Sequence, residues 1–570
     1  MTEPTRPIHQ PTVDPDGSLV AHTVATPKSF KIRARVTVGP RKVIPVIFVP
    51  GIMGTNLRVR RDVALPAGLG LKAGEAAWRP PNGTLDGFTE AWKWAKRNAS
   101  QRQRILDAGI LEVDDSGELD LSGCALSKDE MRERGWGEVH LGSYGALLVE
   151  LQSHLDMTFR ANALGQLEVR EHWKRVMHCR PGRWGTRTIE AITVAELQKY
   201  AAFQYPVYAV GYNWLESCAV SARRLNRRID EIKKFWTSRK HECDKVILVT
   251  HSMGGLVARA CARARAGGVD DPGDIAGVIH GVMPAVGAPV AYRRIACGTE
   301  GSRFDNSLSD NIRADKFVQI AGESAADTTP VLASAPGVLE LLPTTLYPHP
   351  WLVIGTTSRV NNKEEFREIL KLPRGNPYDL YRDMDSWFRM IDPMLADPAE
   401  KNKSMAGGTV GIIRKAIETA EKFHGEVLSV TRGSGEDAVS EPYYHPNTYA
   451  YYGADEDHRA FGRVTWVARM PVGQNLVLTP ANLEQARYIS HAPDGTRTVE
   501  VEGRVRLQFR PWPEDVAGDD TIPLQSGAAP GARVKQLFAT RGFRHQDSYC
   551  DSEMVLLTRH LIVKIVQGVK

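Results

Sequence analysis

The chain has 570 residues, more than a single hydrophobic core normally supports, so we expect a large domain with insertions or more than one domain. Hydrophobic residues make up 42% and charged residues 25%, a composition typical of a folded soluble protein. This composition excludes disorder, a collagen-like repeat or a coiled coil as a description of the whole chain. The formal net charge of +6 is too small to indicate nucleic-acid binding, although a mild positive surplus favours approach to anionic lipid.

The N-terminal residues 1–42 are polar and rich in proline, and we expect them to form a flexible leader. They lack the apolar stretch of a cleavable signal peptide, so synthesis in the cytoplasm is expected. Two apolar stretches, residues 43–54 and 275–291, are shorter than the about 20 residues of a membrane span and contain prolines. Both therefore predict buried strands that run into loops.

Short apolar, β-branched runs then alternate with segments of helical periodicity. The runs are residues 43–49, 206–212, 245–249 and 275–282. Helical spacing follows the second run at 221–236 and the third at 253–266. Strands that are apolar on both faces and alternate with helices are typical of a mostly parallel sheet, so the sequence predicts an α/β fold.

Long segments interrupt this pattern and are expected to be insertions. We predict a cap insertion at 58–200, a lid or cap insertion at 291–440, and a small antiparallel β insertion at 460–510, where apolar and polar residues alternate. The α/β core is then made of residues 43–57, 201–290, 441–459 and 511–570. Insertions in such folds tend to lie over the carboxyl ends of the strands, where ligands bind.

The strongest local motif, VTHSMGG, lies between the third predicted strand and the helix after it. A serine in a tight strand–turn–helix, with small residues two before and two after it, is typical of a nucleophile elbow, which lifts the hydroxyl clear of the sheet. Gly254 fits this pattern, and Thr250 departs from the expected glycine but is still small. We predict Ser252 as a nucleophile; the alternative is a serine that only caps the helix.

A serine nucleophile needs an acid and a histidine, which follow it along the chain in that order. The segment GDDTIPLQSG provides Asp519 and Asp520, and we favour Asp519 because it directly follows Gly518, with Asp520 as the alternative acid. His545 lies between the last predicted strand and the last helix, where it can accept the proton of Ser252 while the carboxylate orients the ring. An ordinary polar turn is the alternative interpretation of the aspartates.

The loop after the first strand, in FVPGIMGTNL, is a candidate oxyanion hole. Gly51 and Gly54 would let it fold back toward Ser252 and present the Ile52 N–H. The second donor would be the Met253 N–H, directly after the nucleophile and at a helix N-terminus. A simple tight turn is the alternative.

Several segments together resemble a known group of lipases: PVIFVPGIMGTNL, YAVGYNWLES, VTHSMGG, PGVLELLPTTLYPHPW and GDDTIPLQS. The group includes lecithin–cholesterol acyltransferase, lysosomal phospholipase A2 and GPI-inositol deacylase-like lipases. RGWGEVHLGSYG and HPNTYAYYGAD most resemble the phospholipase effectors of bacterial type VI secretion. The resemblance implies an α/β-hydrolase fold, a triad of Ser252, Asp519 and His545, and oxyanion donors at Ile52 and Met253. GYNWL replaces the Y-D-W segment of the acyltransferases, so acyl-acceptor specificity is not implied.

We therefore expect a serine carboxylic-ester hydrolase that acts on lipids, phospholipids first and neutral glycerides next, through an acyl-enzyme. A lipid acyltransferase, a peptidase or amidase, and a catalytically inactive binding protein with this fold remain alternatives. Expected partners are the lipid, a transient membrane surface and no nucleic acid. A type VI effector would also be exported toward a target cell, contact the secretion apparatus and need an immunity protein.

No cofactor or metal is expected. The seven cysteines are an odd number without a C-x-x-C pair, which argues against a disulfide framework or a structural zinc site. The acidic residues of 304–315 could bind calcium, but without EF-hand spacing a solvated loop is the better interpretation. His251, inside the elbow, is expected to pack beside the helix rather than to transfer protons.

Overall fold

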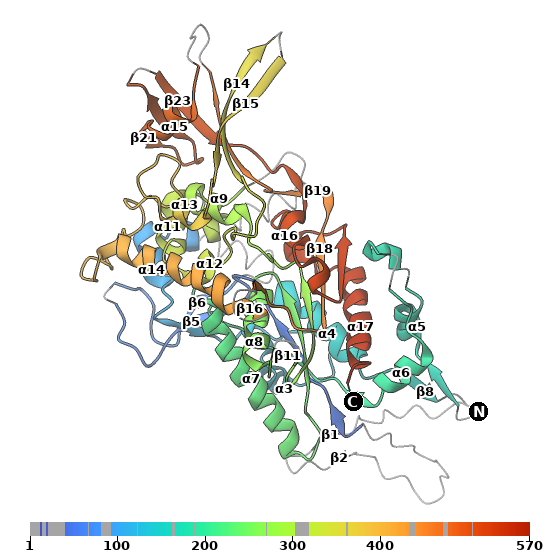
Figure 1. The fold of residues 1–570 in the computed structure, drawn as a ribbon. Coiled ribbons are helices and arrows are strands. Elements are labelled where there is room, and N and C mark those ends of the chain that lie inside the picture. Colours follow the sequence, from blue (N-terminus) through green and yellow to red (C-terminus); the bar gives the residue numbers. More distant parts are fainter. Residues whose placement is uncertain are drawn as a thin grey trace, which may run out of the picture.

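A computed structural model describes residues 12–13, 19–20, 40–66, 68–80, 93–121, 123–161, 166–179, 181–186, 189–268, 271–301, 318–360, 363–432, 439–470, 477–503 and 505–569. Its central element is a six-stranded sheet (Figure 1). The strand order is β11 (Val207–Ala209), β4 (Val46–Val49), β12 (Val246–His251), β13 (Ile275–Gly281), β18 (Thr448–Gly453) and β25 (Gln536–Thr540). Every neighbouring pair is parallel, which confirms the predicted α/β fold class.

Helices cover both faces of this sheet because its strands are apolar on both sides. In β4, Ile47 and Val49 pack in one buried cluster with α7 (Cys218–Ser238) and α8 (Gly254–Arg265). Val46 and Phe48, which point the other way, pack with α17 (Ser552–Val566). The sheet is therefore the middle layer of a three-layer core (Figure 1).

The predicted cap insertion at 58–200 does not form a single cap. Its first part contributes β5 (Leu57–Val59), β6 (Ala76–Trp78) and β7 (Leu111–Val113), which form a separate small sheet. Its second part contains α4 (Leu141–His154), α5 (Glu171–Met177) and α6 (Val194–Tyr200), which pack with α17 against the central sheet. The buried apolar side chains of these helices place them in the core rather than in the predicted cap.

The predicted β insertion is part of a larger second sheet. The strand order is β15 (Lys363–Leu372), β14 (Leu352–Val360), β20 (Val464–Arg469), β23 (Val505–Pro511), β22 (Arg497–Val501) and β21 (Arg487–His491). The hairpin of β14 and β15 comes from the 291–440 segment, which was predicted to be a lid or cap insertion. Since β14 pairs with β20 in parallel, the sheet is mixed rather than purely antiparallel. In Figure 1 it projects away from the central sheet.

The predicted leader lies outside the described residues, apart from residues 40–42 and the antiparallel pair β1 (Thr12–Val13) and β2 (Leu19–Val20). Within the part of the chain that the structure describes, no helix has the length and apolarity that a bilayer crossing requires.

Candidate active site

Ser252 lies in the sharp turn between β12 and α8. Its φ angle of 51° is in the left-handed region, which a non-glycine residue adopts only when the surrounding structure holds it there. The Ser252 N–H donates a 2.9 Å hydrogen bond to the carbonyl oxygen of Gly281 at the end of β13. The turn therefore has the strained strand–turn–helix form of a nucleophile elbow.

The elbow needs a glycine at position 254 because the backbone of a neighbouring strand touches it. A Cβ atom on Gly254 would lie 2.4 Å from the carbonyl oxygen of Pro50 and 2.5 Å from that of Val49. Backbone at the end of β4 cannot rotate away as a side chain can. At Gly255 the nearest atoms to an added Cβ, at 2.6 Å, belong to the flexible Met283 side chain.

We expect Gly254→Ala to lower the free energy of unfolding by about 3 kcal/mol, because strand and helix must move apart. Gly255→Ala is the matched control and should cost at most about 1 kcal/mol, since Met283 can change rotamer and alanine favours the helix. Urea denaturation of both variants measures the difference. Equal midpoints for the two variants would contradict the packing argument.

The structure brings Ser252, His545 and Asp519 together in one hydrogen-bonded line. His545 Nε2 lies 2.8 Å from Ser252 Oγ, and His545 Nδ1 lies 3.0 Å from Asp519 Oδ2. A carboxylate can only accept, so Nδ1 carries the proton and Nε2 presents its lone pair to the serine hydroxyl. All three residues are buried, with exposed fractions of 3%, 8% and 0% in that order.

Asp519, rather than Asp520, faces the histidine. Its Oδ1 accepts hydrogen bonds from the N–H groups of Ile522 (2.7 Å) and Thr521 (3.2 Å), and its carbonyl accepts one from His545 N–H (2.7 Å). These bonds hold the carboxylate toward the imidazole.

Asp520 points away from the triad. With a φ of 71°, its carboxylate lies 3.4 Å from His458 Nδ1 and 3.5 Å from Arg544 Nε. The hydrogen bond to Asp520 raises the pKa of His458, so this aspartate interacts with a second histidine, outside the triad.

The two predicted oxyanion donors lie in the loop after β4 and at the N-terminus of α8. Gly54 N–H donates to the carbonyl of Gly51 (3.1 Å), which closes a tight turn around Ile52, and Met253 is the N-cap residue of α8. Within the described part of the chain, the N–H groups of Ile52 and Met253 donate no hydrogen bond. Neither N–H is therefore committed to another partner among the described residues, as the prediction of an oxyanion hole requires.

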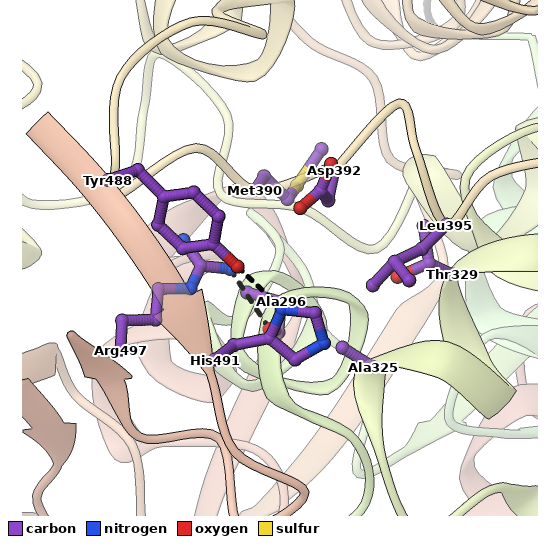
Figure 2. A pocket seen from close by; sticks show the side chains of 9 residues that line it. All are labelled: Ala296, Ala325, Thr329, Met390, Asp392, Leu395, Tyr488, His491 and Arg497. Carbon is purple, nitrogen blue, oxygen red and sulfur yellow. Dashed lines mark hydrogen bonds between the residues drawn. The ribbon is translucent and has the colours of Figure 1, made fainter. Parts of the chain in front are cut away.

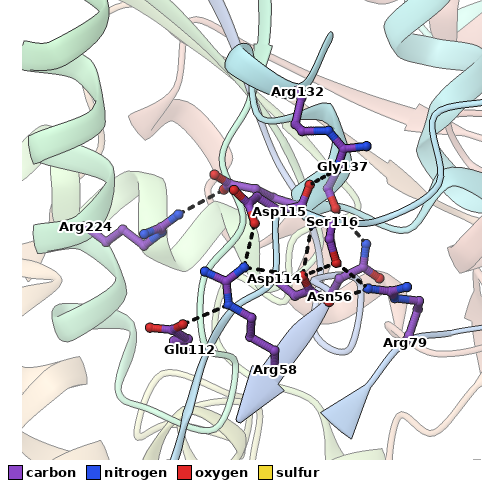
Figure 3. A network of polar contacts seen from close by, with 11 residues as sticks. Asn56, Arg58, Arg79, Glu112, Asp114, Asp115, Ser116, Arg132, Gly137 and Arg224 are labelled. Atoms are coloured by element: carbon purple, nitrogen blue, oxygen red, sulfur yellow. Dashed lines mark hydrogen bonds and ion pairs between the residues drawn. The ribbon is translucent and has the colours of Figure 1, made fainter. Parts of the chain in front are cut away.

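The far end of this loop is held by a polar network that no local sequence pattern indicates (Figure 3). The Asn56 amide donates to the carbonyls of Gly137 (2.9 Å) and Val139 (3.3 Å), and Asn56 N–H donates to that of Glu138 (2.8 Å). Two residues on, Arg58 forms ion pairs with Glu112 and Asp115 on the adjacent segment. These hydrogen bonds and ion pairs fasten the end of the loop to the segments that carry Gly137, Val139 and Glu112.

Known proteins share this architecture. A PGAP1-like alpha/beta domain model matches residues 203–320, which contain β11, β12, the elbow and β13. The chain is also similar to one in the crystal structure of the Tle4–Tli4 complex, with 28% identity over 92% of this chain and 98% of that chain and a TM-score of 0.70. The chain has the α/β-hydrolase fold, and these similarities support a lipase-type hydrolase.

The predicted resemblance of this hydrolase to the GPI-inositol deacylase-like and type VI effector lipases is confirmed by these two similarities. Phospholipase PlaB from Legionella pneumophila also matches, at 9% identity over 53% of this chain and 71% of that chain, but its TM-score of 0.14 is too low to support an argument. A comparison with curated proteins found no match.

A buried carboxylate of the hydrolase fastens the 291–440 segment beside the elbow. Glu340 follows α12 (Pro336–Leu339), is 0% exposed, and accepts hydrogen bonds from Ser217 Oγ (2.5 Å) and Cys218 N–H (2.7 Å) at the start of α7. In the same short helix, a Cβ on Gly337 would lie 2.9 Å from the side chain of Met253. Sequence reasoning missed Glu340, because a single glutamate in an apolar run carries no local signal.

Burial raises the pKa of Glu340 to about 7 from its ordinary value of 4.5. Between these pH values the folded protein keeps a proton that the unfolded chain has lost. The free energy of unfolding should therefore fall as pH rises through this window, by up to about 3 kcal/mol from this group. Glu340→Gln should flatten the dependence, which thermal unfolding at pH 5, 6 and 7 measures. Glu400→Gln, at a side chain that is 66% exposed, is the control and should keep the wild-type slope.

No metal-binding catalytic centre is found among the described residues outside the triad. Within the described ranges, no cluster of three or more His, Cys, Asp or Glu could hold a metal ion, and the candidate calcium segment 304–315 lies outside those ranges. A small pocket lies beside the second sheet and is lined by Asp392, Tyr488, His491 and Arg497, among others (Figure 2). No triad residue lines it, and the Arg497 guanidinium is occupied by backbone carbonyls.

Proposed function

We propose that this hydrolase cleaves carboxylic esters of lipids through an acyl-enzyme on Ser252. The observation that carries the proposal is the line of hydrogen bonds from Ser252 Oγ through His545 to Asp519, at 2.8 and 3.0 Å. Phospholipids are the first expected substrates and neutral glycerides the second.

The proposed reaction has two halves. Ser252 Oγ attacks the ester carbonyl carbon while His545 Nε2 takes the hydroxyl proton, and the N–H groups of Ile52 and Met253 stabilise the oxyanion. His545 then gives its proton to the alkoxide of the leaving alcohol as the ester C–O bond breaks. A water molecule attacks the acyl-enzyme, His545 removes its proton, and the fatty acid leaves as that proton returns to Ser252. Asp519 stabilises the imidazolium throughout.

Two further observations support a lipid substrate and a toxin role. Ser252 is only 3% exposed, and a nucleophile shielded from water is what we expect of an enzyme that draws an apolar acyl chain out of a membrane. The similarity to the chain solved with Tli4 supports an effector that is exported to a target cell by a type VI route and paired with an immunity protein.

The test is incubation with vesicles that contain phosphatidylethanolamine, phosphatidylglycerol and diacylglycerol, followed by mass spectrometry of the products. Wild type should release free fatty acid, and Ser252→Ala should not. A fatty-acyl ester formed on an added alcohol, in place of free acid, would assign an acyltransferase. Absence of both products and of labelling by a fluorophosphonate would leave a binding protein, and cleavage of a peptide or amide substrate instead would assign a peptidase.

We also propose that no metal takes part in the reaction. Hydrolysis should then be unchanged by a chelator. Loss of activity with the chelator and recovery with calcium would overturn this part of the proposal and direct attention to residues 304–315.

A further inference from the structure

We propose that Tyr144 and His251 are positioning residues that tie the oxyanion loop to the loop of the catalytic histidine. The inference rests on the proposed function and adds two residues to which the triad mechanism gives no role. Tyr144 lies on α4, in the segment expected to be a cap, and His251 is the last residue of β12.

A continuous series of hydrogen bonds runs behind the triad. Gly51 N lies 3.2 Å from Tyr144 Oη, and Tyr144 Oη lies 3.0 Å from His251 Nδ1. His251 Nε2 lies 2.8 Å from the carbonyl oxygen of His545. The chain thus starts next to the oxyanion donor Ile52 and ends on the backbone of the catalytic base.

The position of every proton in this series of hydrogen bonds follows from the groups at its two ends. The His545 carbonyl can only accept, so His251 Nε2 carries the ring proton. In the neutral ring Nδ1 must then accept, so the Tyr144 hydroxyl donates to it. The remaining lone pair of Tyr144 accepts the Gly51 N–H. Each donor meets an acceptor, and no other arrangement with a neutral ring satisfies all four groups.

Burial keeps these groups neutral, so the arrangement does not change near physiological pH. Tyr144 is 0% and His251 1% exposed. Burial, with the neighbouring His545 adding to the effect, lowers the pKa of His251 to about 3. Burial also raises the pKa of Tyr144 to about 12.

Close packing lets these hydrogen-bonded residues fix the distance between the oxyanion loop and the elbow. A Cβ on Gly51 would lie 2.6 Å from His251 Nδ1 and 3.0 Å from Ser252 Cβ, so the oxyanion loop rests directly on the elbow. A shift in Tyr144 or His251 would therefore move the donor at Ile52 and the ring of His545 relative to Ser252. Displacements of about 1 Å in such groups are enough to cost about 100-fold in rate. His251 does not act as a base, because both its nitrogens are engaged away from the serine.

The first test is Tyr144→Phe, which removes one hydroxyl and keeps the ring. We expect kcat for ester hydrolysis to fall about 10- to 100-fold, with KM within about threefold of wild type. The rate of fluorophosphonate labelling at Ser252 should fall in parallel. The matched control is Tyr378→Phe, because Tyr378 is also buried and its hydroxyl contacts a histidine, His424, at 2.5 Å, outside the hydrogen-bonded chain behind the triad. This control should lose comparable thermal stability and keep kcat.

The second test separates the two links at His251. His251→Gln keeps a side-chain N–H that can reach the His545 carbonyl, whereas His251→Ala keeps none. We therefore expect kcat of the glutamine variant to be at least tenfold higher than kcat of the alanine variant. Equal rates for these two variants, or a kcat for Tyr144→Phe within twofold of wild type, would overturn the inference. If the wild-type protein itself neither hydrolyses ester nor labels with the fluorophosphonate, the proposed function fails instead, so the two failures are distinguishable.

Discussion

Ser252→Ala is expected to lower kcat for lipid-ester hydrolysis by about 10⁴- to 10⁶-fold. Without the hydroxyl no acyl-enzyme forms, and only the oxyanion donors and substrate binding remain to assist water. The substitution should leave the fold intact, because serine and alanine both carry a Cβ and meet the same strain at a φ of 51°. Initial rates on phospholipid vesicles and thermal unfolding of the same preparations measure the two effects.

Ser221→Ala is the matched control for this prediction. Ser221 lies on α7, is 3% exposed like Ser252, and its hydroxyl has no hydrogen-bond partner among the described residues. Removal of that hydroxyl should change neither the rate nor the melting temperature appreciably. A Ser252→Ala protein that keeps more than about 1% of the wild-type rate would show that Ser252 is not the nucleophile.

Asp519→Asn should lower kcat by about 10⁴-fold. The amide nitrogen of asparagine would donate to His545 Nδ1, which places the ring proton on Nε2 and removes the lone pair that accepts the serine proton. The amide oxygen can still accept the N–H groups of Ile522 and Thr521, so the turn should stay folded. The pH dependence of kcat/KM, together with the melting temperature, distinguishes loss of the base from loss of structure.

Asp520→Asn tests the choice between the two adjacent acids. Its carboxylate interacts with His458 and Arg544, and asparagine tolerates the left-handed backbone that residue 520 adopts. We expect kcat to stay within about threefold of wild type. If Asp520→Asn were the more damaging change, the acid would have to be reassigned and the turn would have to rearrange during catalysis.

Local patterns were sufficient to predict the main strands of the central sheet. The β-branched runs predicted at 245–249 and 275–282 correspond to β12 (Val246–His251) and β13 (Ile275–Gly281), because burial on both faces requires a continuous apolar run. The motif around Ser252 was equally local, since the close approach of strand and helix dictates small residues within a few positions of the serine. The sequence thus determined the sheet's main strands, the elbow and the chain order of the candidate triad.

The tertiary structure alone decided the contacts between distant parts of the chain. Tyr144 meets Gly51 and His251 across 93 and 107 positions, and Glu340 meets Ser217 across 123. Periodicity in a sequence shows which face of an element is buried but not which element buries it, so no pattern placed α4 in the core or joined β14 to β20. Asp519 and Asp520 have the same chemistry and adjacent positions, and only the backbone of the folded turn directs one carboxylate toward His545 and the other away from it.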